Sequence, residues 1–223
     1  MNRATRINTA AIGVLFGFSG ITHGIGELLQ GNRPTGGMFI NAIAAGSRWT
    51  RWVEGSEGAV TLVPNFLLTG TLAVLLGLAI IYWSLCRLHK PWGPGVYLLL
   101  FVLLFLVGGG IGQVIFFIPA WWVATRIRRP LTWWRKVLPP GFQTMLGALW
   151  PTLLIIPSRD HDGGTVSRRL WLCAWFCEHG PPARYHVGNG GVSWLLFLLA
   201  FATAFAYDIV IRPNMTLHKP VLF

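Results

Sequence analysis

Residues 96–124 read VYLLLFVLLFLVGGGIGQVIFFIPAWWVA and contain no charged side chain. A helix needs about 20 mainly apolar residues to cross the hydrocarbon core of a bilayer, so this stretch predicts a transmembrane helix. Its middle holds four glycines, each costing about 1 kcal/mol relative to alanine in a helix. They are Gly108, Gly109, Gly110 and Gly112. Two interpretations are open: a close-packing helix face, or a helix break of the kind that exposes backbone groups in transporters.

The whole chain has the composition of a membrane protein. Of its 223 residues, 53% are hydrophobic and only 11% are charged, whereas a soluble domain carries about 25% charged residues. The mean hydropathy is +0.56. We therefore predict an all-α fold, a polytopic bundle of membrane helices with the lipid bilayer as its surroundings and the cell membrane as its location.

Apolar runs divide this single transmembrane domain, residues 1–223, into four firm spans and one short or re-entrant segment. The spans cover residues 7–29, 59–85, 96–124 and 192–211, and the short segment covers residues 142–157. Residues 158–191 are atypical, because arginine, glycine, proline, histidine and cysteine are frequent there. This polar segment is either a loop or the product of a shifted reading frame, in which case another frame of the coding DNA contains a longer apolar run.

Basic residues outnumber acidic residues by 18 to 7, which gives a formal net charge of +11. They gather at the ends of apolar runs, as residues that meet lipid headgroups do, and no RNA-binding motif or basic helix accompanies them. We therefore expect no binding of nucleic acid. The densest group follows residue 124 and suits an interfacial anchor or a contact with anionic lipid. Its candidates for lipid contact are Arg128, Arg129, Arg135 and Lys136.

A few polar side chains interrupt the predicted spans and are the candidate functional residues, because ionisable groups in a membrane are costly unless protein or water surrounds them. They are His23, Glu27, Asn65, Gln113 and Asp208. His23 and Glu27 are four residues apart and share one helix face. This pair could carry a proton, provide two ligands of a metal, or form structural hydrogen bonds near the membrane surface.

Two further spacings predict contacts, one between helices and one within a helix. The first span carries glycines on one helical face, at positions 13, 17, 20 and 24. Small residues on one face let two membrane helices approach closely, so this face is expected to pack against protein. Asp208 precedes Arg212 by four residues, a spacing that predicts an ion pair on one helix.

Motifs for enzymatic chemistry are absent from the sequence. No Walker, dinucleotide-binding or serine-hydrolase motif occurs, and the spacing of Cys173, Cys177 and His179 lacks the second half of a zinc site. No catalytic residue, metal or cofactor is predicted, and enzymatic activity is not expected. The polar pair and the glycine run favour a transport-type or proton-coupled membrane protein. The alternative is a non-catalytic membrane subunit or scaffold.

Overall fold

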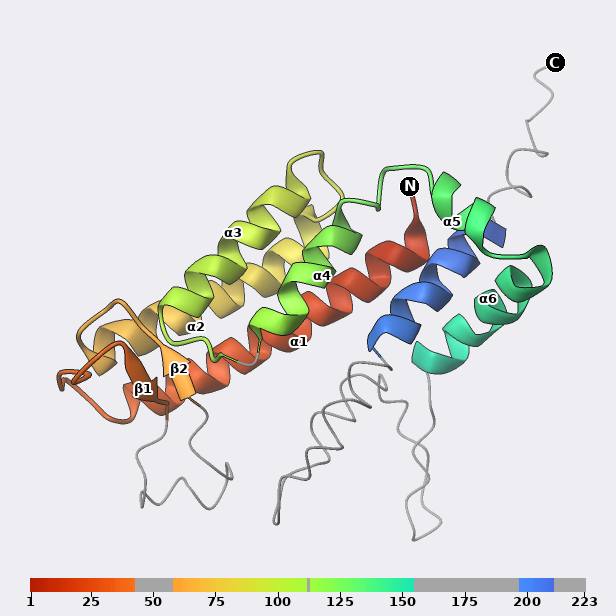
Figure 1. Ribbon diagram of the computed structural model, residues 1–223. Coiled ribbons are helices and arrows are strands. Elements are labelled where there is room, and N and C mark those ends of the chain that lie inside the picture. The colour runs from red at the N-terminus through yellow and green to blue at the C-terminus, as the bar shows by residue number, and fades with distance from the viewer. Residues whose placement is uncertain (43–57, 112, 155–196, 211–223) are drawn as a thin grey trace, which may run out of the picture. The chain divides into compact units, whose positions relative to one another are not determined.

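The chain forms two compact units (Figure 1). The residues that the computed structural model describes are 1–42, 58–111, 113–154 and 197–210. The larger unit consists of the described residues of Thr9–Thr125. The smaller unit consists of Met1–Asn8 and the described residues from Arg126 onward.

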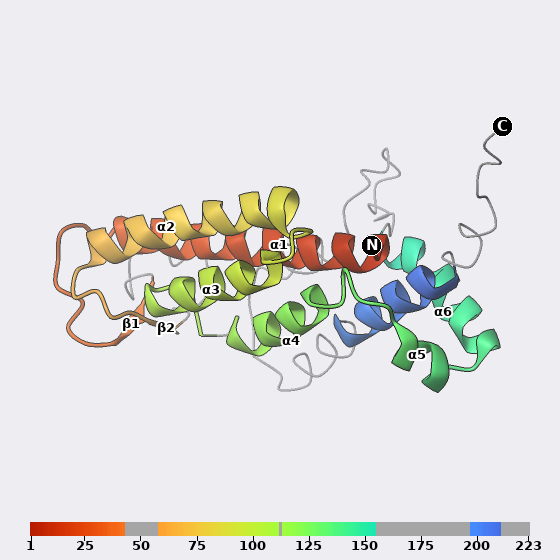
Figure 2. The same ribbon diagram turned by 90° about the horizontal axis from the view of Figure 1, so that it is seen from above.

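The described part of the larger unit consists of helices that lie side by side, with a two-stranded sheet at one end (Figures 1 and 2). In chain order its elements are α1 (Arg3–Leu28, shared with the smaller unit), β1 (Phe39–Asn41), β2 (Gly58–Val60), α2 (Phe66–Tyr82), the π-helical turn η2 (Trp83–Arg87), α3 (Gly93–Leu106) and α4 (Val114–Ala124). The strands are antiparallel, with Phe39 opposite Val60. The sheet lies where α1 ends and α2 begins.

The backbones of α1 and α2 touch at glycines. A Cβ atom on Gly24 would lie 2.7 Å from the carbonyl oxygen of Gly70, and one on Gly17 would lie 2.8 Å from that of Gly77. Real Cβ atoms essentially never approach another atom so closely, so the two crossings require glycine. The predicted glycine face of the first span is thus a packing face, although Gly20 meets α3 rather than α2.

Residues 96–124 form a helical hairpin rather than the single span that their hydropathy predicts. The chain reverses between α3 and α4, and the two helices pack side by side in opposite directions (Figure 2). The rings of Phe101 and Phe117 stack with centroids 5.5 Å apart, whereas one straight helix would separate these residues by about 24 Å along its axis. Hydropathy does not detect such a reversal because both arms are equally apolar.

The backbone around β2 holds the reversal in place. Gly108 N–H donates to the Val60 carbonyl oxygen (2.9 Å), and Leu62 N–H donates to the carbonyl oxygen of Leu106 (2.9 Å). Ile111 N–H donates in the same way to Gly58 (3.2 Å). Backbone groups that leave a helix inside a protein need new partners, and these residues supply them. Residues 58–60 also pair with β1, so hydrogen bonds on both sides keep them extended instead of helical.

Helix α2 therefore begins later than the predicted start of the span 59–85. Pro64 has no N–H and disfavours a helical residue before it. The side chain of Asn65 then accepts hydrogen bonds from the backbone N–H groups of Leu67 (3.0 Å) and Leu68 (3.3 Å). Asn65 is thus the N-cap of α2, which accounts for one of the five polar candidates.

Two of the described helices are long and apolar enough to cross a membrane, as judged by length and composition. They are α1 and the continuous stretch Phe66–Arg87, formed by α2 and η2. The described residues do not show four firm spans, because the other apolar helices are shorter. With 14 and 11 residues, α3 and α4 rise only about 21 and 17 Å, compared with the roughly 30 Å of a hydrocarbon core.

Asp208 joins the two ends of the chain in the smaller unit. The helices among the described residues of this unit are the start of α1, α5 (Thr132–Val137), α6 (Pro140–Leu154) and the unlabelled helix Phe197–Val210. Asp208 accepts hydrogen bonds from the backbone N–H groups of Ala4 (3.0 Å) and Thr5 (2.9 Å) and from the Thr5 hydroxyl (2.6 Å). It therefore caps the N-terminus of α1, where a carboxylate is favourable. Arg212, its expected partner, lies outside the described residues, as does the atypical segment 158–191.

The hairpin determines on which side of the membrane the residues before α3 and after α4 are expected to lie. Reporter fusions that end at residues 90 and 125 are expected to lie on the same side of the membrane, because α3 and α4 return the chain to the end from which it started. A fusion at residue 35, between α1 and α2, is expected on the opposite side. Alkaline phosphatase and green fluorescent protein fusions measure this directly. Opposite signals at residues 90 and 125 would contradict the hairpin and favour a single span over 96–124.

Candidate functional site

Three polar residues of α1 form one face that meets the turn between α3 and α4. Ser19, His23 and Glu27 follow one another at intervals of four, so they lie on the same side of the helix. At one end of this face, Gln113 donates a hydrogen bond from Nε2 to Ser19 Oγ (3.2 Å). Because Gln113 directly precedes α4, this bond holds the start of α4 against α1.

Two glycines with positive φ bring the backbone of the turn against the other two residues. Gly108 has a φ of 97° and Gly110 a φ of 91°, values that glycine adopts readily. A Cβ atom on Gly108 would lie 2.6 Å from Cδ and Oε2 of Glu27, and one on Gly110 would lie 3.1 Å from Cε1 and Nε2 of His23. The turn needs glycine here for both its conformation and its closeness to the polar face.

The remaining glycines of the run differ in their surroundings. Gly109 continues from the end of α3, where its N–H donates to the carbonyl oxygen of Leu104 (2.8 Å). A Cβ atom on Gly109 would lie 2.6 Å from that same oxygen, so this position also requires glycine. Gly112 lies outside the described residues.

The carboxyl group of Glu27 is completely enclosed. Its side chain has an exposed fraction of 0%, and neither carboxyl oxygen has a geometrically suitable hydrogen-bond donor among the described residues. The Thr69 hydroxyl lies beside this carboxyl group, but it donates its proton to the carbonyl oxygen of Val107 (2.7 Å). Thr69 also shares a 2.7 Å hydrogen bond with the Thr61 hydroxyl. A charge on Glu27 would therefore be poorly compensated.

His23 and Glu27 are the groups of this site that can exchange a proton. His23 is buried one turn before Glu27 on the same face, and a carboxyl group next to an imidazole can take up and release a proton. Over the described ranges, no three His, Cys, Asp or Glu side chains come together to hold a metal. Cys173, Cys177 and His179 belong to the segment that the structure does not describe.

The structure brings three of the five predicted polar residues to this turn. They are His23, Glu27 and Gln113. Two further residues of the site, Ser19 and Thr69, were not predicted from the sequence. The interval of four between Ser19 and His23 is a signal that could have identified Ser19. Thr69 comes from another helix, and no local pattern connects it with Glu27.

No protein-family model matches this chain, and comparisons with curated proteins and with solved structures find no match.

Proposed function

We propose that this chain is a multi-pass integral protein of the cell membrane with a transport-type, proton-coupled function in which Glu27 carries the proton. The observation that carries the proposal is the enclosed Glu27 carboxyl group beneath the glycine turn between α3 and α4. The membrane location and the proton function rest on different features.

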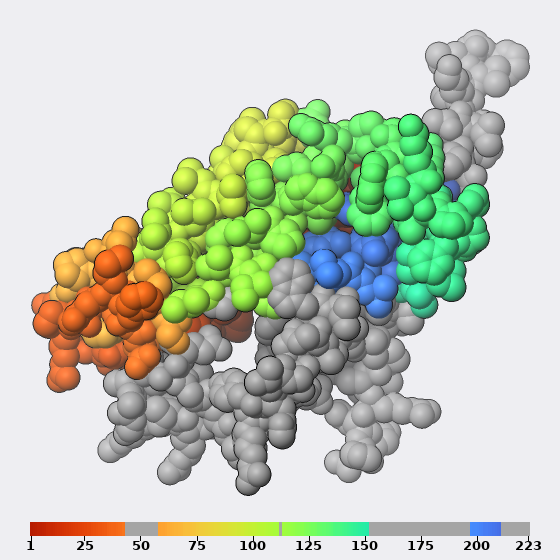
Figure 3. All heavy atoms as spheres, viewed as in Figure 1, coloured from red at the N-terminus to blue at the C-terminus, as the bar shows by residue number. Residues whose placement is uncertain are grey.

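The apolar surface supports the membrane location. Leucines on the outside of α2 are exposed at positions 67, 68, 72, 75 and 78. On the face shown in Figure 3, α3 and α4 form a large part of the surface of the larger unit, and Leu99, Ile115 and Ile118 are exposed on these two helices. Soluble monomers rarely expose contiguous apolar patches larger than a few hundred Å². In a bilayer, lipid chains would cover this surface, and its apolar side chains would not be exposed to water.

The surroundings of Glu27 support a proton as the transported or coupling ion. An ionised carboxylate without a donor is unfavourable in a bilayer interior, and protonation removes its charge. Water would reach Glu27 if Gly108 moved away, since this residue lies against the carboxyl group. Gly108 and Gly110 lack the side chains that restrict backbone rotation, so the turn is the natural moving part. A proton could then exchange at Glu27 each time the turn opens.

A scaffold or non-catalytic subunit is the second candidate, and the glycine crossings favour it. At Gly17 and Gly77, as at Gly24 and Gly70, the backbones of α1 and α2 are in direct contact, which leaves no space for a substrate between these two helices. In that case the glycine turn is only a tight connection, and Glu27 keeps one protonation state under all conditions.

Infrared difference spectra of the full chain in liposomes test whether Glu27 exchanges a proton. We expect a carboxyl C=O band to change between acidic and alkaline buffer, to be absent in Glu27→Gln and to shift in Glu27→Asp. Gln113→Leu, which removes a neighbouring polar group but no carboxyl group, is the matched control and keeps the band. A spectrum that is identical in wild type and Glu27→Gln would contradict the proton function. The scaffold function would then be the remaining candidate.

Liposomes that contain a pH-sensitive dye measure translocation. When a potassium diffusion potential, negative inside, draws protons inward, wild-type protein is expected to acidify the lumen faster than protein-free liposomes do. Glu27→Gln is expected to lose most of this difference because it cannot bind a proton, whereas Glu27→Asp retains part of it. If Glu27→Gln acidifies the lumen as fast as wild type, Glu27 is not the carrier.

A further inference from the structure

The described part of the smaller unit is rich in basic residues. Its described residues contain one acid, Asp208, and seven basic residues: Arg3, Arg6, Arg126, Arg128, Arg129, Arg135 and Lys136. Asp208 is buried, and its carboxylate accepts the hydrogen bonds from Ala4 and Thr5. The exposed cations of this unit therefore have no exposed acidic neighbour among the described residues of the same unit.

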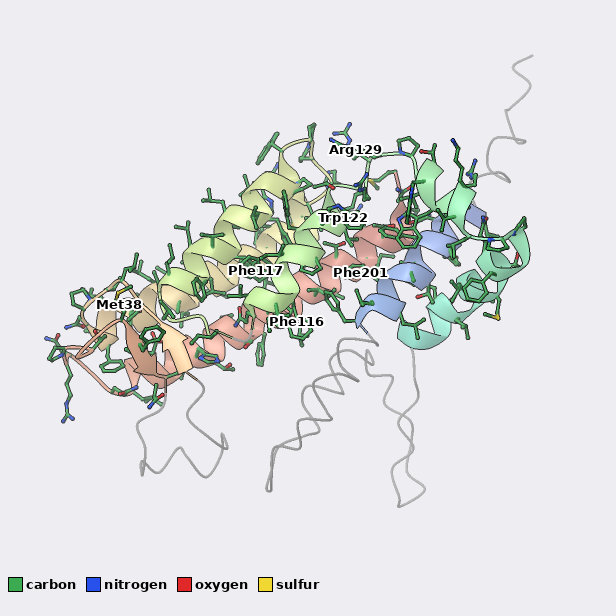
Figure 4. The ribbon with its side chains drawn as sticks, in the orientation of Figure 1. Met38, Phe116, Phe117, Trp122, Arg129 and Phe201 are labelled. Atoms are coloured by element: carbon green, nitrogen blue, oxygen red, sulfur yellow. The ribbon has the colours of Figure 1, made fainter. Side chains whose placement is uncertain are left out.

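The N-terminus fixes two of these cations in a turn. Asn2 donates from its backbone N–H to the carbonyl oxygen of Ile127 (2.7 Å) and from Nδ2 to those of Arg126 (2.7 Å) and Arg129 (3.0 Å). Ile127 is buried, and the side chains of Arg128 and Arg129 are exposed. Figure 4 shows Arg129 on the connection that follows α4. Three hydrogen bonds to Asn2 thus hold a turn on which the side chains of Arg128 and Arg129 are exposed.

Two adjacent tryptophans on α5 lie in different surroundings, one packed against the protein and one exposed. The ring of Trp134 packs on Phe205, with centroids 5.2 Å apart, and anchors α5. Trp133 stands perpendicular to Trp134 and has an exposed fraction of 61%. Arg135 and Lys136 follow on the same short helix and are exposed. The segment therefore presents an exposed indole ring beside exposed cations.

We propose that this segment binds the headgroups of anionic phospholipids through Arg128, Arg129, Arg135 and Lys136, with Trp133 at the level of the headgroups. Guanidinium groups form paired hydrogen bonds with phosphate, and tryptophan favours the boundary between headgroups and acyl chains. Basic residues near a membrane surface are attracted to anionic lipid. The proposal is independent of Glu27, since it concerns other residues and another ligand.

Short-chain lipids added to the full chain in neutral detergent test the proposal. Thermophoresis or native mass spectrometry is expected to show tighter binding of dioctanoyl phosphatidylglycerol than of dioctanoyl phosphatidylcholine. The double variant Arg135→Gln/Lys136→Gln is expected to weaken phosphatidylglycerol binding about 25-fold, since each cation contributes about fivefold. The matched pair Arg87→Gln/Lys90→Gln removes equal charge from the connection between η2 and α3 and leaves this binding unchanged.

Several outcomes would overturn the proposal. One is equal affinity of wild type for the two lipids, which does not depend on any variant. Others are full binding by a correctly folded Arg135→Gln/Lys136→Gln protein, or inorganic phosphate displacing the lipid at equal concentration, which would indicate a site for free anions. Tighter binding of a single-stranded oligonucleotide than of phosphatidylglycerol would indicate a nucleic-acid surface. Arg135→Lys keeps the charge but loses the paired hydrogen bonds, and binding by this variant between that of wild type and that of Arg135→Gln supports the proposal.

Discussion

Replacing Gly108 with alanine is expected to destabilise the folded chain by about 3 kcal/mol, because two effects combine. An L-residue at a φ of 97° is strained by about 1–2 kcal/mol. The new methyl group would also lie 2.6 Å from Cδ of the enclosed Glu27, and such overpacking typically costs about 1–3 kcal/mol more. Thermal unfolding of the purified protein in detergent, followed by tryptophan fluorescence, measures the loss.

Two other glycines separate these effects. Gly31 has a φ of 78°, and an added Cβ atom there would have no neighbour within 4 Å, so Gly31→Ala carries only the backbone strain. Gly95 has neither a positive φ nor a close neighbour, so Gly95→Ala is expected to be nearly neutral. Adding Glu27→Ala to Gly108→Ala should recover part of the stability, because the colliding carboxyl group is gone. Equal losses of stability for Gly31→Ala and Gly108→Ala would show that close contact with Glu27 does not add to the cost at Gly108.

The second large effect is expected at the crossing of α1 and α2. A Cβ atom on Gly70 would lie 2.6 Å from the Gly24 carbonyl oxygen and 2.8 Å from the Leu28 nitrogen. Both atoms belong to backbone and cannot rotate away, so Gly70→Ala must separate the helices. We expect a loss of about 3 kcal/mol, at the upper end for overpacked interiors. Thermal unfolding and retention of the monodisperse fraction in harsher detergents measure it.

A control and a double variant make this result specific. Gly141 lies in α6, and an added Cβ atom there would have no neighbour within 4 Å, so Gly141→Ala tests helix propensity alone and should be neutral or slightly stabilising. Gly24→Ala and Gly70→Ala widen the same crossing, and their combined loss should therefore be smaller than the sum of the two. A Gly70→Ala protein as stable as Gly141→Ala would contradict the close crossing.

Local sequence patterns predict some residues of the site, but they do not predict which of these residues contact one another. The interval of four between His23 and Glu27 places them on one helix face, and the glycine run marks Gly108 and Gly110 as unusual. Neither pattern reveals that these glycines lie against this pair, because the residues are about 80 positions apart in the chain. Asp208 is a similar case. Its interval to Arg212 suggests an ion pair, whereas its described partners are Ala4 and Thr5.

The helical class, the apolar segments and the glycine face of α1 follow from the sequence alone, because composition and helical periodicity are local properties. The reversal between α3 and α4 is a tertiary property. Both arms are apolar and suit one long helix as well as two short ones, so hydropathy cannot distinguish them. The difference comes from β2, whose carbonyl oxygens accept hydrogen bonds from Gly108 and Ile111, and from α1, whose polar face lies against Gly108 and Gly110. Contacts between distant segments therefore place Glu27 under the turn.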